Sequence, residues 1–282
     1  MQNDIYVKQG FSMIENPKVK DLYRLQEDVL GRLQVMRDAQ FAQAKLCGGT
    51  AMSRCWLGHR VSYDLDFFLP EGFDAGRMAT KLKTANVAYE TKDIVDDPHK
   101  ANQLHGYVTH QGQRLQVSFI EDAYFNVYPA VKATFGALSA NTEQIAGLYH
   151  RKLRTVAGGG SEGDSFEGGR QKARDLFDLY VLSVTVMPIK PFMASLPYAF
   201  PSDVFDNGLV SMPWLELMDE LQEIVCDQKW NAAKDVAFLQ DALYQQIGAQ
   251  VLDQFVPEVD PKPESRKAFS QVKRRGPGGL IK

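Results

Sequence analysis

The feature that most constrains this chain is a glycine pair followed closely by two aspartates that are spaced one residue apart. The two segments are Cys47-Gly48-Gly49-Thr50 and Ser62-Tyr63-Asp64-Leu65-Asp66. Because alternate side chains of a strand point to the same face, Asp64 and Asp66 present two carboxylates side by side. An apolar run precedes the glycines and another follows the aspartates. We therefore predict a strand, a short helix from Thr50 and a second strand around one site.

Both halves of this segment suit a phosphorylated ligand. Mg²⁺ prefers oxygen ligands such as carboxylates and usually shares its remaining positions with substrate phosphates. A glycine pair lets the backbone approach a ligand closely, and a helix that begins at Thr50 aims free N–H groups at an anion. Each half alone has an ordinary explanation, since an Asp-x-Asp pair is more often solvated surface or a helix cap and a Gly-Gly is usually a turn. Their order and spacing favour nucleotidyl transfer.

Two motifs resemble those of a known protein family. The first consists of Gly48-Gly49-Thr50, Arg60, Ser62 and Asp64-Leu65-Asp66-Phe67. The second consists of Lys152 and the block Arg174-Asp175-Leu176-Phe177-Asp178-Leu179-Tyr180. Both are similar to motifs of the AbiEii-type nucleotidyltransferases, the toxin halves of type IV toxin–antitoxin and abortive-infection systems within the DNA polymerase β-like superfamily. The resemblance covers roughly Lys45 to Leu182.

The resemblance implies an α+β fold, in which a polymerase β-like nucleotidyltransferase palm with a mixed sheet and helices is followed by a helical domain. It implies a Mg²⁺-dependent enzyme, with room for two metal ions, that transfers NMP from an NTP to a tRNA end or a protein. It also implies an antitoxin partner. The alternative is a catalytically silent protein of the same fold, which binds nucleotide and acts through RNA or protein contacts.

The resemblance also assigns roles to the motif residues. Asp64 and Asp66 hold the metal and are catalytic, as are Lys152, which neutralises triphosphate charge, and Asp175, which faces the cleft. The nucleotide-binding residues are Gly48, Gly49, Thr50, Arg60, Ser62, Arg174 and Asp178.

Structural explanations of the same residues stay open. Lys152 is also explained as a solvated helix lysine, and Arg60 and Ser62 as a cap or a salt bridge to Asp64. Asp175 and Asp178 are three residues apart on one helix with Arg174, and this block is also explained as an Arg-Asp surface pair that supports the domain junction.

The third carboxylate of polymerase β-like enzymes has no evident counterpart here. It generally lies on a later strand between apolar residues, and the matching strand of this chain ends at Asp122. The alternation of that strand places Ser118 at the acidic position, which removes one charge from the metal cage and a base-like ligand near the attacking hydroxyl. Glu121 or Asp122 could substitute only through a bulge or another register, and Asp93 and Asp96 are the next candidates.

Composition favours a cytoplasmic globular protein. Its 282 residues suffice for one large or two ordinary domains, and a net charge of −3 excludes a protein coated in positive charge. No apolar run is long enough for a membrane span, and the N-terminus lacks a signal-peptide pattern. The three scattered cysteines indicate reduced thiols. The histidines form no cluster, so we interpret His105 and His110 as ordinary strand residues.

Hydrophobic periodicity predicts the elements. Helices are expected from Asn16-Pro17 to Met36 and over 74–87, 142–156, 169–186, 212–227 and 230–255, and strands over 89–95, 104–109 and 115–120. We divide the chain into a palm at 1–130, a helical domain at 131–260 and a flexible tail at 261–282. The glycine-rich insert 157–169 lacks the ending of a P-loop and is interpreted as a linker. The tail is basic, which suits a solubilising terminus or an RNA contact.

Overall fold

The computed structural model describes residues 16–97, 99–158, 172–197 and 200–249, and these residues belong to one compact unit. Their strands are β1 (Lys45–Cys47), β2 (Asp64–Leu69), β3 (Tyr89–Val95), β4 (Gln103–His110), β5 (Gln113–Glu121), β6 (Ala130–Phe135) and β7 (Leu138–Glu143). Their α-helices are α1 (Pro17–Val35), α2 (Gly48–Ala51), α3 (Ala75–Thr84), α4 (Ile145–Ala157), α5 (Ala173–Thr185), α6 (Ile189–Ala194), α7 (Ser202–Val210), α8 (Met218–Gln222) and α9 (Val236–Ile247). A mixed sheet with helices confirms the predicted α+β class.

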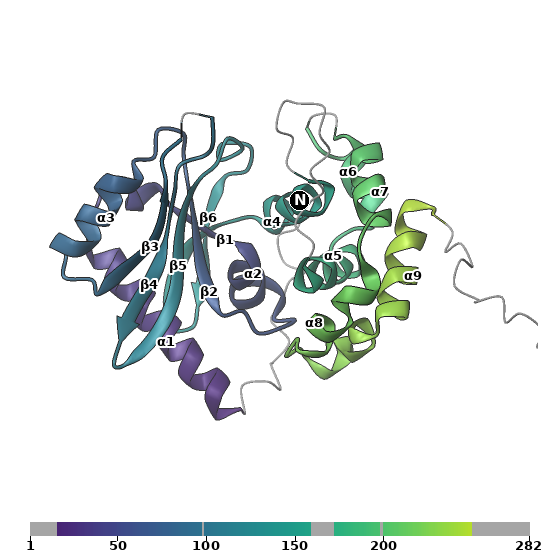
Figure 1. Ribbon diagram of the computed structural model, residues 1–282, viewed down its shortest axis with the longest axis horizontal. Helices are drawn as coiled ribbons and strands as arrows, with labels where there is room; N and C mark the ends of the chain where they lie inside the picture. The colour runs from purple at the N-terminus through teal and green to yellow at the C-terminus, as the bar shows by residue number, and fades with distance from the viewer. Residues whose placement is uncertain (1–15, 98, 159–171, 198–199, 250–282) are drawn as a thin grey trace, which may run out of the picture. The chain divides into compact units, whose positions relative to one another are not determined.

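The seven strands of the described residues form one sheet in the order β3-β4-β5-β2-β1-β7-β6. The β2–β5 and β1–β7 pairs are parallel, and the other pairs are antiparallel. Strand β2, which carries the two aspartates, therefore lies inside the sheet, between β5 and β1 (Figure 1). Because backbone hydrogen bonds hold a central strand along both edges, its side chains are placed rigidly.

Helices α1 and α3 cover one face of the sheet (Figure 1). Helix α1 begins where the sequence predicts, because the Asn16 side chain accepts a hydrogen bond from the Lys18 N–H and Pro17 occupies the first turn. Helix α3 is capped by Asp74, which accepts from the Arg77 N–H. The buried sides of both helices belong to the same hydrophobic core as the buried side of β2.

Strand β2 alternates as its sequence predicts. Leu65, Phe67 and Leu69 are buried in the core, whereas Asp64 and Asp66 lie on the opposite face and are partly exposed. That opposite face borders a cavity to which α2, α4 and α5 also contribute residues. The alternation of β2 thus separates the side chains that stabilise the fold from those available for chemistry.

The glycine pair turns the chain from β1 into α2. Gly48 has a φ of +67°, a left-handed value that glycine adopts without strain. Helix α2 begins at Gly48, earlier than the predicted start at Thr50, and continues as a π-helical turn over Met52–Leu57. A Cβ at Gly48 would lie 2.9 Å from Asp66 Oδ2, so the glycine lets this carboxylate pack directly on the backbone.

The predicted boundary between palm and helices, at residue 130, falls too early. Residues 130–143, assigned to the helical domain, form the β6–β7 hairpin and extend the sheet through the β1–β7 pair. The helices begin only at Ile145, and sheet and helices share one hydrophobic core. The two strands are short and partly exposed, so their apolar periodicity is weak. From residue 159 on, the glycine-rich insert lies outside the described residues, as does the tail at 261–282.

The predicted helices 142–156 and 169–186 correspond to α4 and α5, but the C-terminal helices are shorter than predicted. A 3₁₀ helix at Trp214–Leu217 precedes α8, and a second one at Gln228–Lys234 precedes α9. Asp235 separates the latter pair, because its side chain caps α9 by accepting from the Phe238 N–H. The short helices α6 and α7 were not predicted.

Candidate active site

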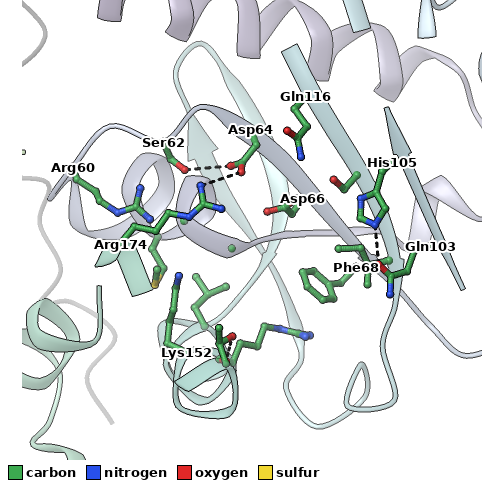
Figure 2. Close-up of a pocket in the computed structure, with 18 residues that line it drawn as sticks. Arg60, Ser62, Asp64, Asp66, Phe68, Gln103, His105, Gln116, Lys152 and Arg174 are labelled. Atoms are coloured by element: carbon green, nitrogen blue, oxygen red, sulfur yellow. Dashed lines mark hydrogen bonds and ion pairs between the residues drawn. The ribbon is translucent and has the colours of Figure 1, made fainter. Parts of the chain in front are cut away.

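A cavity of about 360 Å³ lies between the aspartate face of the sheet and helices α2, α4 and α5. Its lining includes most of the residues predicted from the two motifs (Figure 2): Gly48, Gly49, Arg60, Ser62, Asp64, Asp66, Lys152 and Arg174. The fold therefore brings both motifs to one place, although they are far apart in the sequence.

Asp64 is held by three neighbours. The Thr50 hydroxyl donates to its main-chain oxygen at 2.6 Å, and the Ser62 hydroxyl lies 3.3 Å from its Oδ1. Arg174 Nη1 lies 3.7 Å from its Oδ2 (Figure 2). Thr50 is buried and does not line the cavity. Its placement therefore supports a role in positioning the aspartate strand and not the predicted nucleotide contact.

Arg60 forms a buried ion pair with α5. Its Nε and Nη2 donate to the two carboxylate oxygens of Asp178 at 2.6 and 2.7 Å, which is a bidentate arrangement. A Cβ at Gly49 would lie 2.4 Å from Arg60 Nη2, so this glycine makes room for the guanidinium. Arg60 thus ties the loop before β2 to the helical part of the chain.

Lys152 extends from α4 into the same network. Its Nζ lies 2.5 Å from Asp175 Oδ1 and 2.7 Å from Asp178 Oδ2, and its side chain lines the cavity. Lys152 is 6% exposed and both aspartates are 0% exposed, so the explanations as a solvated lysine and a surface pair are wrong. The two aspartates do not line the cavity themselves. Arg60 and Lys152, the cations that they bind, do line it.

The charges of this network are balanced. Two cations, Arg60 and Lys152, face two carboxylates, Asp175 and Asp178. Burial alone would raise the pKa of Asp178, but the charges of Arg60 and Lys152 hold it well below its usual range. His59 Nε2 lies 2.7 Å from Asp178 Oδ1, and burial lowers the pKa of this histidine, which favours its neutral form. His59 was not among the predicted site residues.

Arg151 is a second fixed cation beside the cavity. It donates to both carboxylate oxygens of Glu143 at 2.6 and 2.8 Å and to Asp122 at 2.7 Å. Its guanidinium carbon lies 4.3 Å from the centre of the Phe68 ring, a cation–π contact. Arg151 and Phe68 both line the cavity, but their contact joins α4 to β2 and leaves no local signal in the sequence.

Ser118 occupies the predicted position of the third carboxylate. Strand β5 pairs with β2 so that Ser118 stands beside Asp66, and Ser118 lines the cavity. The predicted alternation of this strand is confirmed, because Gln116, Ser118 and Ile120 line the cavity. Glu121 does not replace the missing acid, because its two carboxylate oxygens accept hydrogen bonds from the N–H groups of Gly72 and Asn102.

The remaining acids do not complete the site either. Asp122 pairs with Arg151, and neither Asp93 nor Asp96 lines the cavity. Among the described residues, no three His, Cys, Asp or Glu side chains are grouped closely enough to hold a metal ion. The donor set is the carboxylate pair of β2, which fits one Mg²⁺ ion that completes its shell with phosphate oxygens and water. It does not support the predicted site for two ions.

Strands β4 and β5 form a further side of the cavity that the sequence analysis missed. Gln103, His105 and Gln116 line it, and His105 Nε2 lies 2.7 Å from Gln103 Oε1 (Figure 2). His105 stands opposite Ser118 in the β4–β5 pairing, and Ser118 stands beside Asp66 in the β2–β5 pairing. The β2–β5 and β4–β5 pairings together place this histidine on the same face of the sheet as the aspartates, two strands away from Asp66.

A sequence family and solved structures of known proteins are similar to this chain. A family model described as "Nucleotidyl transferase AbiEii toxin, Type IV TA system" matches residues 32–269. A crystal structure from H. pylori, described as a candidate nucleotidyltransferase, matches with a TM-score of 0.48 and 17% identity over 83% of this chain and 94% of that chain. The Helicobacter pylori protein JHP933 matches with a TM-score of 0.44 and 17% identity over 82% of this chain and 92% of that chain. No curated protein sequence matches.

None of the described helices is both long enough and apolar enough to cross a bilayer.

Proposed function

Because this chain belongs to the AbiEii family of nucleotidyltransferase toxins of type IV toxin–antitoxin systems, we propose that it transfers NMP from an NTP to an acceptor hydroxyl in a Mg²⁺-dependent reaction. The observation that carries the proposal is the composition of one cavity. Asp64 and Asp66 lie on its sheet wall, and the cations Lys152 and Arg174 lie on its helical wall. Carboxylates that bind a metal and cations that bind phosphates are the two requirements of this chemistry.

Asp64 and Asp66 are the metal-binding residues in this proposal. When bound, Mg²⁺ neutralises charge at the reacting phosphate. Gly48 lines the cavity directly beside Asp66 and adds no side chain there, so a triphosphate can approach the backbone next to the carboxylates. Ser62 and Thr50 hold Asp64 in place through the contacts described above.

Arg174 and Lys152 bind the triphosphate in different ways. The Arg174 side chain is 42% exposed, and its 3.7 Å distance to Asp64 is longer than a hydrogen bond. It is therefore free to turn toward phosphate oxygens and to bind them with two donors. Lys152 is fixed by Asp175 and Asp178 before any ligand arrives, so it stabilises phosphate charge without reorganisation. In this proposal Asp175, Asp178 and Arg60 are positioning residues.

The family supports an antitoxin as a partner of this protein. We propose that the acceptor is a tRNA end or a protein side chain and that an antitoxin protein restrains the enzyme. None of the three cysteines forms a disulfide bond, which suits a reducing compartment, and we place the protein in the cytoplasm.

A second candidate function is nucleotide binding without transfer. Ser118 favours it, because a neutral side chain stands where a third carboxylate would strengthen the metal site. Such a protein would bind NTP and act through RNA or protein contacts. The two candidates differ in one observable, the appearance of label on an acceptor.

Incubation with α-labelled NTPs, Mg²⁺ and total tRNA tests the proposal. We expect label on the tRNA, and we expect Asp64→Asn or Asp66→Asn to lower the rate by about 100-fold or more, because each change removes a charged metal ligand without changing its shape. Calorimetry should show weaker binding of Mg²⁺–NTP in the same variants.

The matched control is Asp203→Asn, which changes an exposed carboxylate in the first turn of α7. Its transfer rate should stay within about twofold of wild type, as expected for a surface change. Tight NTP binding without transfer to tRNA or to total protein would establish the second candidate. Unchanged binding and transfer in both β2 variants would contradict the metal assignment.

A further inference from the structure

The cavity has a second side that triphosphate binding does not use. In Figure 2, Arg60, Ser62 and Arg174 lie on one side of Asp64 and Asp66. The side chains of Gln103, His105 and Gln116, which come from β4 and β5, lie on the other side. A transfer reaction needs two subsites, one for the donor and one for the acceptor, and this uncharged polar side is open for the acceptor.

The strand register sets the distance between the two sides. Asp66, Ser118 and His105 form one row across three neighbouring strands, and all three line the cavity. Neighbouring strands lie roughly 5 Å apart, so the backbones of Asp66 and His105 are separated by about 10 Å. The small side chain of Ser118 stands between them.

Gln103 determines which nitrogen of His105 can act as a base. His105 Nε2 lies 2.7 Å from Gln103 Oε1, and an amide oxygen only accepts hydrogen bonds, so Nε2 carries the hydrogen. The other nitrogen, Nδ1, then holds a lone pair. Burial lowers the pKa of His105, and on β3 Asp93 raises it while Lys92 lowers it.

The neighbours of His105 on β5 carry no charge that would shift its pKa. Ser118 and Gln116 are uncharged residues of that strand, and both line the same side of the cavity. A neutral imidazole with a defined tautomer is the form that a general base requires.

We propose that the side of the cavity formed by Gln103, His105 and Gln116 is the acceptor subsite, and that His105 Nδ1 removes the proton from the acceptor hydroxyl. The inference rests on the proposed function and names the base that Ser118 cannot provide. The acceptor oxygen forms a bond to the α-phosphorus, and the bond from the α-phosphorus to the bridging oxygen breaks. Pyrophosphate leaves with that electron pair. The hydroxyl proton moves to Nδ1, and the resulting imidazolium returns it to solvent.

The test uses the full-length protein, total tRNA as the acceptor probe, α-labelled NTPs and Mg²⁺. His105→Gln is expected to lower the transfer rate by about 100-fold or more, the usual contribution of a positioned general base. Binding of Mg²⁺–NTP, measured by calorimetry, should stay within about twofold of wild type, because His105 lies on the acceptor side. The matched control is His110→Gln on the same strand, where the histidine pairs with Asp28 outside the cavity.

Chemical rescue separates catalysis from packing. Added imidazole should restore part of the transfer activity of His105→Ala, and the acidic limb of the pH–rate profile should be present in wild type and absent in His105→Gln. The proposal is overturned if His105→Gln transfers at a near wild-type rate, or if NTP binding falls as much as transfer does. Wild-type protein that binds NTP and transfers nothing to tRNA or total protein would instead refute the proposed function, and the base assignment with it.

Discussion

On the helical side of the cavity, Arg60, Lys152 and Arg151 are each bound to buried carboxylates, whereas on the sheet side Gln103 and His105 are joined to each other by a hydrogen bond between side chains. Buried ion pairs of this kind are rigid, because removing one partner leaves the other as an unpaired buried charge, which destabilises the fold. The helical side is therefore suited to the triphosphate, whose charge and shape are the same in every NTP. The sheet side has neutral groups that suit a hydroxyl acceptor.

The two sides of the cavity also differ in what they contribute to folding. The helical side joins the loop before β2 to α4 and α5 through Arg60, Lys152 and Asp178, so the same contacts that place cations at the cavity connect the sheet to the helices. The sheet side is built on strand pairing, and its Gln103–His105 contact joins two side chains of the same strand, β4. The variants below test this contrast between the two sides.

The largest expected effect comes from Asp178→Asn. It leaves the buried Arg60 and Lys152 with one carboxylate less, and breaking buried pairs of this kind costs about 3–5 kcal/mol in the free energy of unfolding. Urea denaturation at pH 7 measures this loss. The matched change on the sheet side, Gln116→Ala, removes an exposed amide and should cost less than about 0.5 kcal/mol. Equal losses in the two variants would show that the two sides do not differ in this way.

The second-largest effect should come from acid, which lowers the stability of the fold through the helical side. His150 of α4 packs on the rings of Tyr124 and Tyr128, and burial, followed by the charges of Arg154 and Arg151, lowers its pKa to about 4. The unfolded histidine titrates near 6.5, so the unfolded chain takes up a proton that the folded chain rejects. Stability is therefore complete above about pH 6.5 and falls as the pH drops toward 4.

Between pH 7 and pH 5 this one group should lower the free energy of unfolding by about 2 kcal/mol. His150→Phe keeps an aromatic ring in the same place and should flatten the slope of stability against pH. The control is His110→Gln, which changes a histidine at the end of β4. A slope that persists in His150→Phe, or that is lost equally in the control, would show that His150 is not its source.

Arg174→Gln should separate ligand binding from folding. The exposed side chain contacts Asp64 at 3.7 Å, so its loss should change the free energy of unfolding by less than about 0.5 kcal/mol. Loss of a two-donor contact to phosphate should weaken NTP binding about tenfold, measured by calorimetry. Arg114→Gln, an exposed pair with Glu90 away from the cavity, is the matched control and should alter neither quantity. A stability loss with unchanged binding would place Arg174 among the structural contacts.

Much of the fold was predictable because strong local patterns produced it. The alternation of β2, the Asn16-Pro17 start of α1 and the alternation of β5 that turns Ser118 toward the cavity all follow from side-chain period and capping. The β6–β7 hairpin was missed because its half-exposed strands carry no clear apolar pattern, and its place in the sheet depends on pairing with β1. Tertiary pairing, and not local propensity, determined that part of the fold.

The candidate site was predictable only where a motif carried it. Asp64, Lys152 and Arg174 reach the cavity as the motifs indicate. The motifs do not show that Asp178 binds Arg60 while Arg174 stays near Asp64, because a choice between arginines depends on helix rotation and burial. His105 was missed for a related reason. Its place in one row with Ser118 and Asp66 depends on how β4, β5 and β2 pair, and the sequence does not show these pairings.

The smallest expected effect, and the sharpest test of the contrast, comes from Ser118→Asp. The new carboxylate would stand beside Asp66, so we expect the Mg²⁺ concentration for half-maximal transfer to fall several-fold, since hard cations bind more tightly to a site with more carboxylates. Without metal the two like charges repel, so thermal unfolding in EDTA should occur at a lower temperature than in wild type, and Mg²⁺ should reverse the change. Ser118→Asn, which adds similar volume without charge, is the control and should show neither metal effect.

The same variant also tests the role of His105. A third carboxylate near the acceptor oxygen supplies the function that we assign to this histidine, so His105→Gln should cost less in the Ser118→Asp background than in wild type. A double-mutant cycle on the transfer rate measures this coupling. If the two changes are additive and the Mg²⁺ requirement is unchanged, the row formed by Asp66, Ser118 and His105 does not connect metal and acceptor. The two sides of the cavity would then act independently of each other.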